Sequence, residues 1–183
     1  DFEFIILDDG STDDTPSIIH EYAAKDSRIR AISLEHEGIV VALNHGVSVA
    51  KSDWIARMDC DDISHPERFA KQWAAIKKNP HVVLCHTQIK MIGENKYIKK
   101  SPYLVRSHSL LKLRLCHQCP ISHPSVLFRK KIFNAVGGYR PEERHAEDYA
   151  LWGRMAEQGT FLGIPKTLLQ FRVHSNSISK KNL

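Results

Sequence analysis

Aspartates gather at two places in this chain of 183 residues, and each group directly follows a short apolar run. The first group is Asp8 and Asp9, and the second is Asp59, Asp61 and Asp62. Like charges held this close repel one another unless a cation or a proton lies between them. Carboxylate oxygens are hard ligands that suit Mg²⁺ or Mn²⁺, and these cations also bind phosphate oxygens. Aspartate also favours turns and caps, but two groups that both follow apolar runs favour a functional site.

Both acidic groups are expected at the ends of strands, because the apolar runs before them are typical of buried parallel strands. The first half is expected to hold a strand at 2–7, a helix from 14, a strand at 29–34, a helix at 39–50, a strand at 54–58, a helix at 66–79 and a strand at 82–85. This alternation is typical of an α/β fold with an open, mostly parallel sheet flanked by helices. Ligands bind such sheets beyond the carboxyl ends of the strands, where both acidic groups stand.

The second half of the chain has a less regular pattern. Its expected elements are a hairpin at 91–98 around Gly93-Glu94-Asn95, helices at 109–115, 130–136 and 147–158, and strands at 126–128, 161–164 and 168–173. No stretch has the composition of an interdomain linker, and the length suits one compact domain with a sizeable core. We therefore expect a single domain over residues 1–183.

The composition is ordinary for a globular protein, with a formal net charge of +5 and scattered basic residues. We expect no nucleic-acid partner. The basic residues fit a solvated surface, and attraction to phosphorylated ligands or to an anionic membrane surface is the alternative. The four cysteines fit reduced thiols. We therefore expect a cytoplasmic protein, with peripheral association at the inner face of the membrane left open.

Seven short motifs follow one another along the chain. They are ILDDGSTD at 6–13, GIVVALNHG at 38–46, ARMDCDD at 56–62 followed by PER at 66–68, HPSV at 123–126, GGY at 137–139, AEDYALW at 146–152 and FRVHSNSIS at 171–179. In this order they resemble bacterial-type family 2 glycosyltransferases, which have the GT-A fold. A lone DxD motif would be a weak signal, but the ordered set covers nearly the whole chain.

The resemblance implies that the first acidic group binds the nucleotide sugar. Asp8 or Asp9 would accept a hydrogen bond from the donor base, because a carboxylate suits the imide N–H of uracil or thymine. Ser11 would belong to the same site. Arg57 would contact the diphosphate or pair with an aspartate.

The second acidic group resembles the metal-binding DxD motif of the family. Asp61 would bind Mn²⁺ or Mg²⁺, and Asp59 would contact the metal or the ribose of the donor. Asp62 would support the loop from behind. His174 would be a further ligand of the metal or the diphosphate, and a surface histidine after an edge strand is the alternative.

The AEDYALW motif resembles the segment that carries the catalytic base of the family. Asp148 would take the proton of the acceptor hydroxyl while that oxygen attacks the anomeric carbon opposite the nucleotide, so the configuration inverts. Its place near a helix N-terminus favours the ionised form. A plain helix cap is the alternative for Asp148, and Glu147 would act on the helix dipole or in positioning.

The resemblance also implies a division of labour and a substrate class. Residues 1–90 would bind the nucleotide sugar, a UDP-sugar by default, and residues 91–183 would bind the acceptor and carry out catalysis. The acceptor would be a glycan or a lipid-linked hydroxyl in cell-surface polysaccharide biosynthesis. A nucleotidyltransferase is the main alternative, but its Gly-rich, basic phosphate loop is not visible. A non-catalytic glycan- or nucleotide-sugar-binding relative is the second alternative, and the presence of both Asp61 and Asp148 argues against it.

Members of the family begin with an apolar strand, a Pro-x-Tyr-Asn type turn and a helix, and this unit is not found here. In the GT-A sheet, that strand lies between the strand before Asp8 and the strand before Asp59. A sheet without it would leave buried N–H and C=O groups unpaired. We therefore expect an N-terminally truncated chain that lacks this strand.

Overall fold

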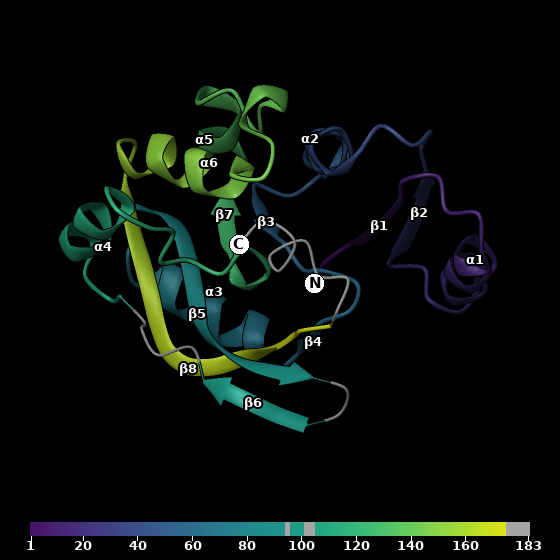
Figure 1. The fold of residues 1–183 in the computed structure, drawn as a ribbon, viewed down its shortest axis with the longest axis horizontal. Helices are drawn as coiled ribbons and strands as arrows, with labels where there is room; N and C mark the ends of the chain where they lie inside the picture. Colours follow the sequence, from purple (N-terminus) through teal and green to yellow (C-terminus); the bar gives the residue numbers. More distant parts are fainter. Residues whose placement is uncertain (94–95, 101–104, 175–183) are drawn as a thin grey trace.

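The computed structural model describes residues 1–93, 96–100 and 105–174, and it has the predicted α/β composition (Figure 1). The strands are β1 (Phe4–Asp8), β2 (Ile29–Ser33), β3 (Trp54–Ala56), β4 (Ile63–Ser64), β5 (Val82–Gly93), β6 (Lys96–Lys100), β7 (Leu127–Arg129) and β8 (Thr160–Arg172). The helices are α1 (Thr15–Lys25), α2 (Ile39–Val49), α3 (Arg68–Lys77), α4 (His108–Leu115), α5 (Lys130–Ala135) and α6 (Glu147–Ala156), with short 3-10 turns η1 (His123–Ser125) and η2 (Pro141–Glu143).

The described strands form two sheets rather than one. β1 and β2 pair in parallel, and the other strands form a second sheet in the order β3-β7-β5-β8-β4, with β6 paired to β5. In the second sheet only β5 and β8 are parallel, which departs from the expected mostly parallel arrangement. An apolar run carries no information on strand direction. The short link between β5 and β6 also forbids a parallel pair, which needs a crossover of a dozen or more residues.

Two expected strands near the C-terminus are a single long strand. β8 pairs with β5 along most of its length, and Ile164 and Thr167 face the consecutive residues Thr87 and Gln88. Pro165 and Lys166 therefore bulge out of the ladder. A proline has no N–H to donate, so a bulge is one of the few places where a strand accepts it. The sequence pattern predicts a strand end at residue 164, just before Pro165.

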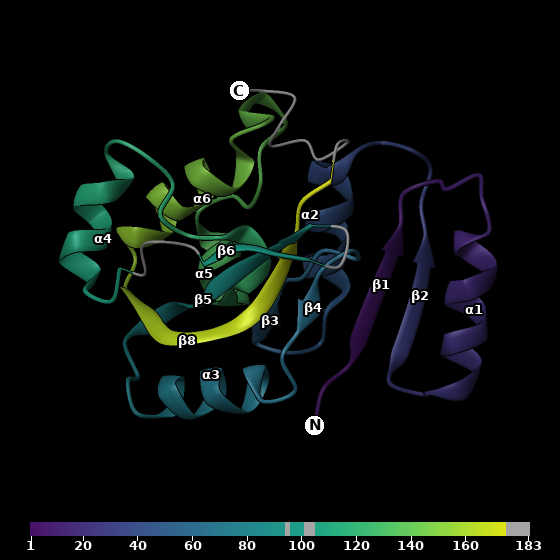
Figure 2. The ribbon, with the colours of Figure 1, turned by 60° about the horizontal axis from the view of Figure 1, so that its bottom comes forward.

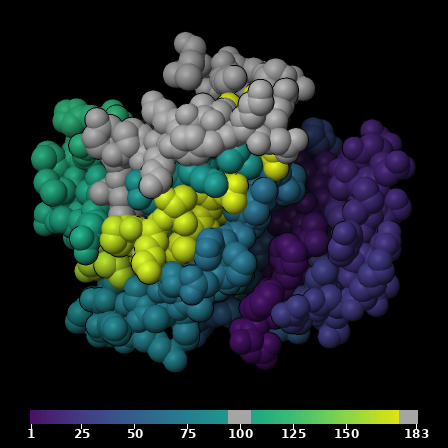
Figure 3. Space-filling model, turned by 90° about the horizontal axis from the view of Figure 1, so that it is seen from below, coloured from purple at the N-terminus to yellow at the C-terminus, as the bar shows by residue number. Residues whose placement is uncertain are grey.

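β1 and β3 are not joined by hydrogen bonds, so the N-terminal unit of β1, α1 and β2 stands apart from the larger sheet (Figure 2). Figure 3 shows this unit in purple and blue as a block on one side of the molecule, with teal-blue atoms between it and the yellow of β8. Among the described strands, β1 pairs only with β2 and β3 only with β7. The two unpaired edges are in line with the predicted intervening strand, which stays a prediction.

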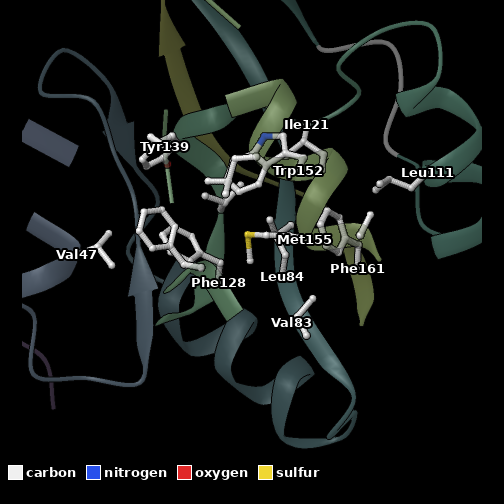
Figure 4. Close-up of a cluster of buried hydrophobic side chains, with 14 of the residues drawn as sticks. Val47, Val83, Leu84, Leu111, Ile121, Phe128, Tyr139, Trp152, Met155 and Phe161 are labelled. Atoms are coloured by element: carbon white, nitrogen blue, oxygen red, sulfur yellow. The ribbon is translucent and has the colours of Figure 1, made fainter. Parts of the chain in front are cut away.

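The main core lies between the larger sheet and α6 (Figure 4). Apolar residues recur on one face of α6, which is the pattern of a helix packed on a sheet. Trp152 and Met155 of this helix are fully buried in the same cluster as Leu84 of β5 and Phe161 of β8, and the Trp152 ring lies 6.2 Å from that of Phe128. The core therefore fixes the helix whose first turn carries Asp148.

A reciprocal pair of hydrogen bonds joins α2 to the GGY motif. The side chain of Asn44 accepts from the N–H of Tyr139 at 3.1 Å and donates to its carbonyl at 2.8 Å. Gly138, next to Tyr139, has φ +60°, and an added Cβ would lie 2.8 Å from the Asn44 Oδ1 atom. Only a glycine therefore fits this contact between segments far apart in the chain.

Gly138→Ala is expected to lower the free energy of unfolding by about 1–3 kcal/mol, because the variant combines a left-handed backbone with a steric overlap. Chemical denaturation of the variant measures this effect. Gly153→Ala is the matched control, because Gly153 is helical and an added Cβ meets nothing within 4 Å. The control is expected to gain about 0.5–1 kcal/mol. Equal stability of the two variants would contradict the conclusion that only a glycine fits at position 138.

Candidate active site

The second acidic group lies in a loop that is held at both ends by the larger sheet. β3 leads into the loop and pairs with β7, and β4 leaves it and pairs with β8. Within the loop, one carboxylate oxygen from each of Asp59, Asp61 and Asp62 lies within 4.8 Å of the others. The sheet therefore holds the loop so that three carboxylates lie close together.

The end of β8 completes this acidic site. The Nε2 atom of His174 lies 3.3 Å from the Oδ2 atom of Asp61, although 113 positions separate them in the sequence. Arg172, two residues earlier, donates from Nε to the main-chain carbonyl of Asp61 at 2.9 Å. His174 therefore lies beside the DxD motif, and its role as a ligand of the metal or the diphosphate stays a prediction.

Asp62 faces inward and ties the loop to β8. Its Oδ1 atom accepts a hydrogen bond from the N–H of Arg172 at 2.8 Å, and its side chain is buried. Burial raises the pKa of the Asp62 carboxyl to about 6, and the neighbouring Asp59 and Asp61 add to the rise. Asp62 is therefore placed to support the loop, as its position in the motif predicts.

Arg57 is the cation at the beginning of the loop. Its buried guanidinium binds both carboxylate oxygens of Asp59, with a distance of 2.6 Å from NH1 to Oδ2. A bidentate pair of this kind fixes the orientation of both side chains. Of the two roles expected for Arg57, pairing with an aspartate is the one that the geometry shows. A contact with a diphosphate remains a prediction.

The donor set of this loop fits a divalent cation. Carboxylate oxygens with one imidazole nitrogen suit Mn²⁺ and Mg²⁺, with Mn²⁺ favoured by the imidazole. Asp61 and His174 are both part-exposed, so a ligand can reach them from solvent. The Oδ2 atom of Asp62 is buried and has no hydrogen-bond partner among the described residues. Three carboxylates around one point, with a histidine beside one of them, are an arrangement that a cation would stabilise.

Asp148 lies in the first turn of α6, where its Oδ1 atom accepts the N–H of Tyr149 at 2.7 Å. Burial raises the pKa of its carboxyl, the adjacent Glu147 adds to the rise, and the charge of Arg57 opposes it. The helix N-terminus is expected to favour the ionised form of Asp148, but the effect of burial on the pKa is larger. A raised pKa makes Asp148 a stronger base in its ionised form.

The carboxylates of the first acidic group accept hydrogen bonds from main-chain N–H groups. The Oδ1 atom of Asp8 accepts the N–H of Ser11 at 3.1 Å. The two carboxylate oxygens of Asp9 accept the N–H groups of Glu37 and Gly38, at 3.1 and 3.0 Å, just before α2. Both carboxylates thus shape loops at the carboxyl end of β1. Their predicted contact with a nucleotide base remains a prediction, as does that of Ser11.

The structure therefore gathers the predicted residues into two groups. The DxD loop, Arg57 and His174 form one group, and the charge of Arg57 opposes the rise in the pKa of Asp148, the expected base. Asp8, Asp9 and Ser11 form the other group, on the separate unit. The closing residues 175–179 of the last motif, and Glu94 and Asn95 of the hairpin, lie outside the described residues.

Three residues at this site were missed from the sequence. Arg172 binds the loop twice, and the signal in the sequence is its place two residues before His174 in the FRVHSNSIS motif. His123 and Tyr139 share a hydrogen bond of 2.7 Å between Nε2 and the hydroxyl. Burial holds the pKa of His123 well below its ordinary value, so its imidazole is neutral. In the sequence, His123 and Tyr139 belong to the HPSV and GGY motifs, and nothing in those motifs predicts their contact.

The described part of the chain contains no helix that is long and apolar enough to cross a membrane. All four cysteines are free thiols, and Cys85 is the buried one.

Comparison with known proteins identifies glycosyltransferases as relatives of this chain. The family model described as glycosyl transferase family 2 matches residues 1–137. An O-antigen biosynthesis glycosyltransferase of Escherichia coli, WbnJ, is 31% identical over 188 residues, which cover 100% of this chain and 72% of that protein. An uncharacterised glycosyltransferase of Haemophilus influenzae is 30% identical over 184 residues, covering 98% of this chain and 67% of the relative.

Solved structures show the same fold at lower identity. TarS of Staphylococcus aureus in complex with UDP-GlcNAc has a TM-score of 0.76 at 18% identity, over 96% of this chain and 51% of that one. The mannosyltransferase PcManGT of Pyrobaculum calidifontis, in complex with GDP-Man and Mn²⁺, has a TM-score of 0.70 at 16% identity, over 98% of this chain and 50% of that one. The chain thus spans about half of each of these solved chains. By its motifs, its GT-A fold and these matches, the chain belongs to family 2 of the glycosyltransferases.

Proposed function

We propose that this glycosyltransferase is metal-dependent and inverting, and that it moves a sugar from a nucleoside-diphosphate sugar to a hydroxyl of a glycan or lipid-linked acceptor. The contact between His174 and Asp61 carries the proposal, because it brings a second type of metal ligand to the DxD loop from the far end of the chain. Asp61 is also one of three aspartates whose carboxylate oxygens lie within 4.8 Å of one another.

The roles of the residues follow from their surroundings. Asp59, Asp61 and His174 would hold Mn²⁺ or Mg²⁺, which when bound would neutralise the charge of the departing diphosphate. Asp148 would accept the proton of the acceptor hydroxyl at its carboxylate. Arg57 pairs with Asp59, and its charge also opposes the rise in the pKa of Asp148. Attack from the side of Asp148, opposite the nucleotide, inverts the anomeric carbon.

The donor and the cellular role are proposed from the relatives. One solved neighbour binds UDP-GlcNAc and another binds GDP-Man with Mn²⁺, so the fold accepts either nucleotide. The DDGS turn on β1 makes a UDP-sugar our first candidate, with Asp8, Asp9 and Ser11 near the nucleotide. The similarity to an O-antigen glycosyltransferase supports a role in cell-surface polysaccharide synthesis. Free thiols support a cytoplasmic site, including the inner face of a membrane.

A panel of UDP-, GDP- and dTDP-sugars, each with Mn²⁺ or Mg²⁺, tests the proposal. Slow release of nucleoside diphosphate, stopped by a chelator and restored by the metal, is the expected result. Release of pyrophosphate from a nucleoside triphosphate would instead favour the nucleotidyltransferase. Tight nucleotide-sugar binding without turnover, in the presence of acceptor extracts, would favour the non-catalytic relative.

A further inference from the structure

Two polar side chains of α3 are completely buried behind the DxD loop. Arg68 and Gln72, one helical turn apart, have exposed fractions of 0%. The Nε atom of Arg68 donates to the Oε1 atom of Gln72 at 3.1 Å, so each orients the other. An arginine is almost never fully buried unless it is paired, which makes this position unusual and calls for a physical reason.

Arg68 binds main-chain carbonyls rather than a carboxylate. Its NH2 atom donates to the carbonyl of Arg57 at 2.8 Å and to that of Val126 at 3.2 Å. The N–H of Arg57 donates to the same Val126 carbonyl at 3.2 Å. The guanidinium therefore holds the chain at the residue where β3 ends and the acidic loop begins.

Gln72 extends the same arrangement to two more segments. Its Nε2 atom donates to the carbonyl of Cys85 in β5 at 3.2 Å and to that of Ser125 in η1 at 3.0 Å. Together, Arg68 and Gln72 bind four carbonyls from β5, η1, the start of β7 and the start of the acidic loop. No other turn of the described α3 makes contacts of this kind to the sheet.

Stability alone explains this pair poorly. Removing a guanidinium from water costs several kcal/mol, and well-packed apolar side chains in such places are often as good or better for stability. The NH1 atom of Arg68 has no hydrogen-bond partner among the described residues. The carbonyl contacts of Arg68 fix the direction in which the acidic loop leaves β3, and the charge of the guanidinium attracts that of Asp62 in this loop.

We propose that Arg68 and Gln72 are positioning residues for the acidic loop, holding its first residue so that Asp59 and Asp61 converge on the cation and the donor. We call Arg68, Gln72 and their four carbonyl contacts the clamp. The inference rests on the proposed function, because the clamp matters only if the acidic loop binds the metal and the nucleotide. Neither residue touches the ligand. Their effect reaches it through the main chain of Arg57 and through the charge behind the loop.

Binding of Mn²⁺ to the intact protein, measured by calorimetry without donor and then with UDP, tests the clamp. Arg68→Met is expected to weaken Mn²⁺ binding about 10- to 100-fold, as removal of outer partners of metal ligands does. Arg68→Lys keeps the charge but not the planar fork, so it should recover part of the affinity. Gln72→Met removes the two other carbonyl contacts without a change in charge and should also weaken binding.

The control is Ile76→Ala, one turn further along α3, where a buried apolar side chain packs in the smaller core and has no polar atom to bind these carbonyls. It lowers the melting temperature but should leave Mn²⁺ affinity unchanged well below that temperature. Unchanged affinity in folded Arg68→Met overturns the clamp. If Arg68→Met does not fold, unchanged affinity in Gln72→Met overturns it. A wild-type protein that binds no Mn²⁺, even with UDP, overturns the proposed function instead.

Discussion

Replacing Asp61 with alanine is expected to lower kcat about 10²- to 10³-fold at saturating donor, the usual effect of losing one preorganised electrostatic partner of the transition state. The side chain is at once part of the carboxylate cluster and the contact of His174. Its removal leaves the imidazole without its anionic neighbour and opens the cluster to solvent. Nucleoside diphosphate release over a series of Mn²⁺ concentrations measures the effect.

The concentration series separates two ways in which the Asp61 variant could fail. A lower rate that returns at high Mn²⁺ indicates lost metal affinity, and a lower rate at saturation indicates lost transition-state stabilisation. Asp53→Ala is the control, because Asp53 is an exposed aspartate just before β3 whose side chain has no hydrogen bond or ion pair to the loop among the described residues. Wild-type activity of Asp61→Ala at ordinary Mn²⁺ concentrations would remove this residue from the site.

Asp148→Asn is expected to lower kcat about 10²- to 10⁴-fold while donor binding is kept, because it removes the proton acceptor and preserves the shape of the side chain. Only the ionised carboxylate accepts the proton. Since burial raises the pKa of Asp148, the rate of the wild-type enzyme should increase with pH through a value above that of an ordinary aspartate, and then level off. The Asn variant should lack this acidic limb.

Stability should change in the opposite direction to activity in Asp148→Asn. A carboxyl group whose pKa is raised in the native state favours folding at low pH and loses that contribution as the pH rises through the raised value. At neutral pH the buried carboxylate is therefore a cost, and the Asn variant should be at least as stable as wild type. Glu147→Gln, the adjacent acid, is the control. A similar kcat in Asp148→Asn and wild type would point to a plain helix cap.

The acidic loop and Asp148 could be selected as candidate site residues from the sequence because their motifs are local. Asp59, Asp61 and Asp148 stand at fixed places beside a strand end or a helix start, and a short window contains all the information needed to find them. His174 also followed from a motif. Its contact with Asp61 could not be derived, because that distance depends on how β4 and β8 pair.

The partners of each side chain were much harder to predict. Asp8 and Asp9 look like ligands in the sequence, yet in the structure their carboxylates accept main-chain N–H groups of nearby turns. Arg68 reads as the end of a PER motif, and its burial depends on three segments that meet only in the fold. Strand direction was hidden for the same reason, since apolar runs of β7 and β8 look alike whichever way they enter the sheet.

The unpaired edge of β1 has a practical consequence for handling this chain. Free strand edges expose rows of N–H and C=O groups that recruit strands from other molecules, and natural proteins block them with charges, prolines or covering segments. β1 is apolar for most of its length, and Phe4 within it and Phe2 just before it are about half exposed. A preparation of these 183 residues alone is therefore prone to concentration-dependent, β-rich self-association, and a charged substitution such as Phe4→Lys should improve its solubility.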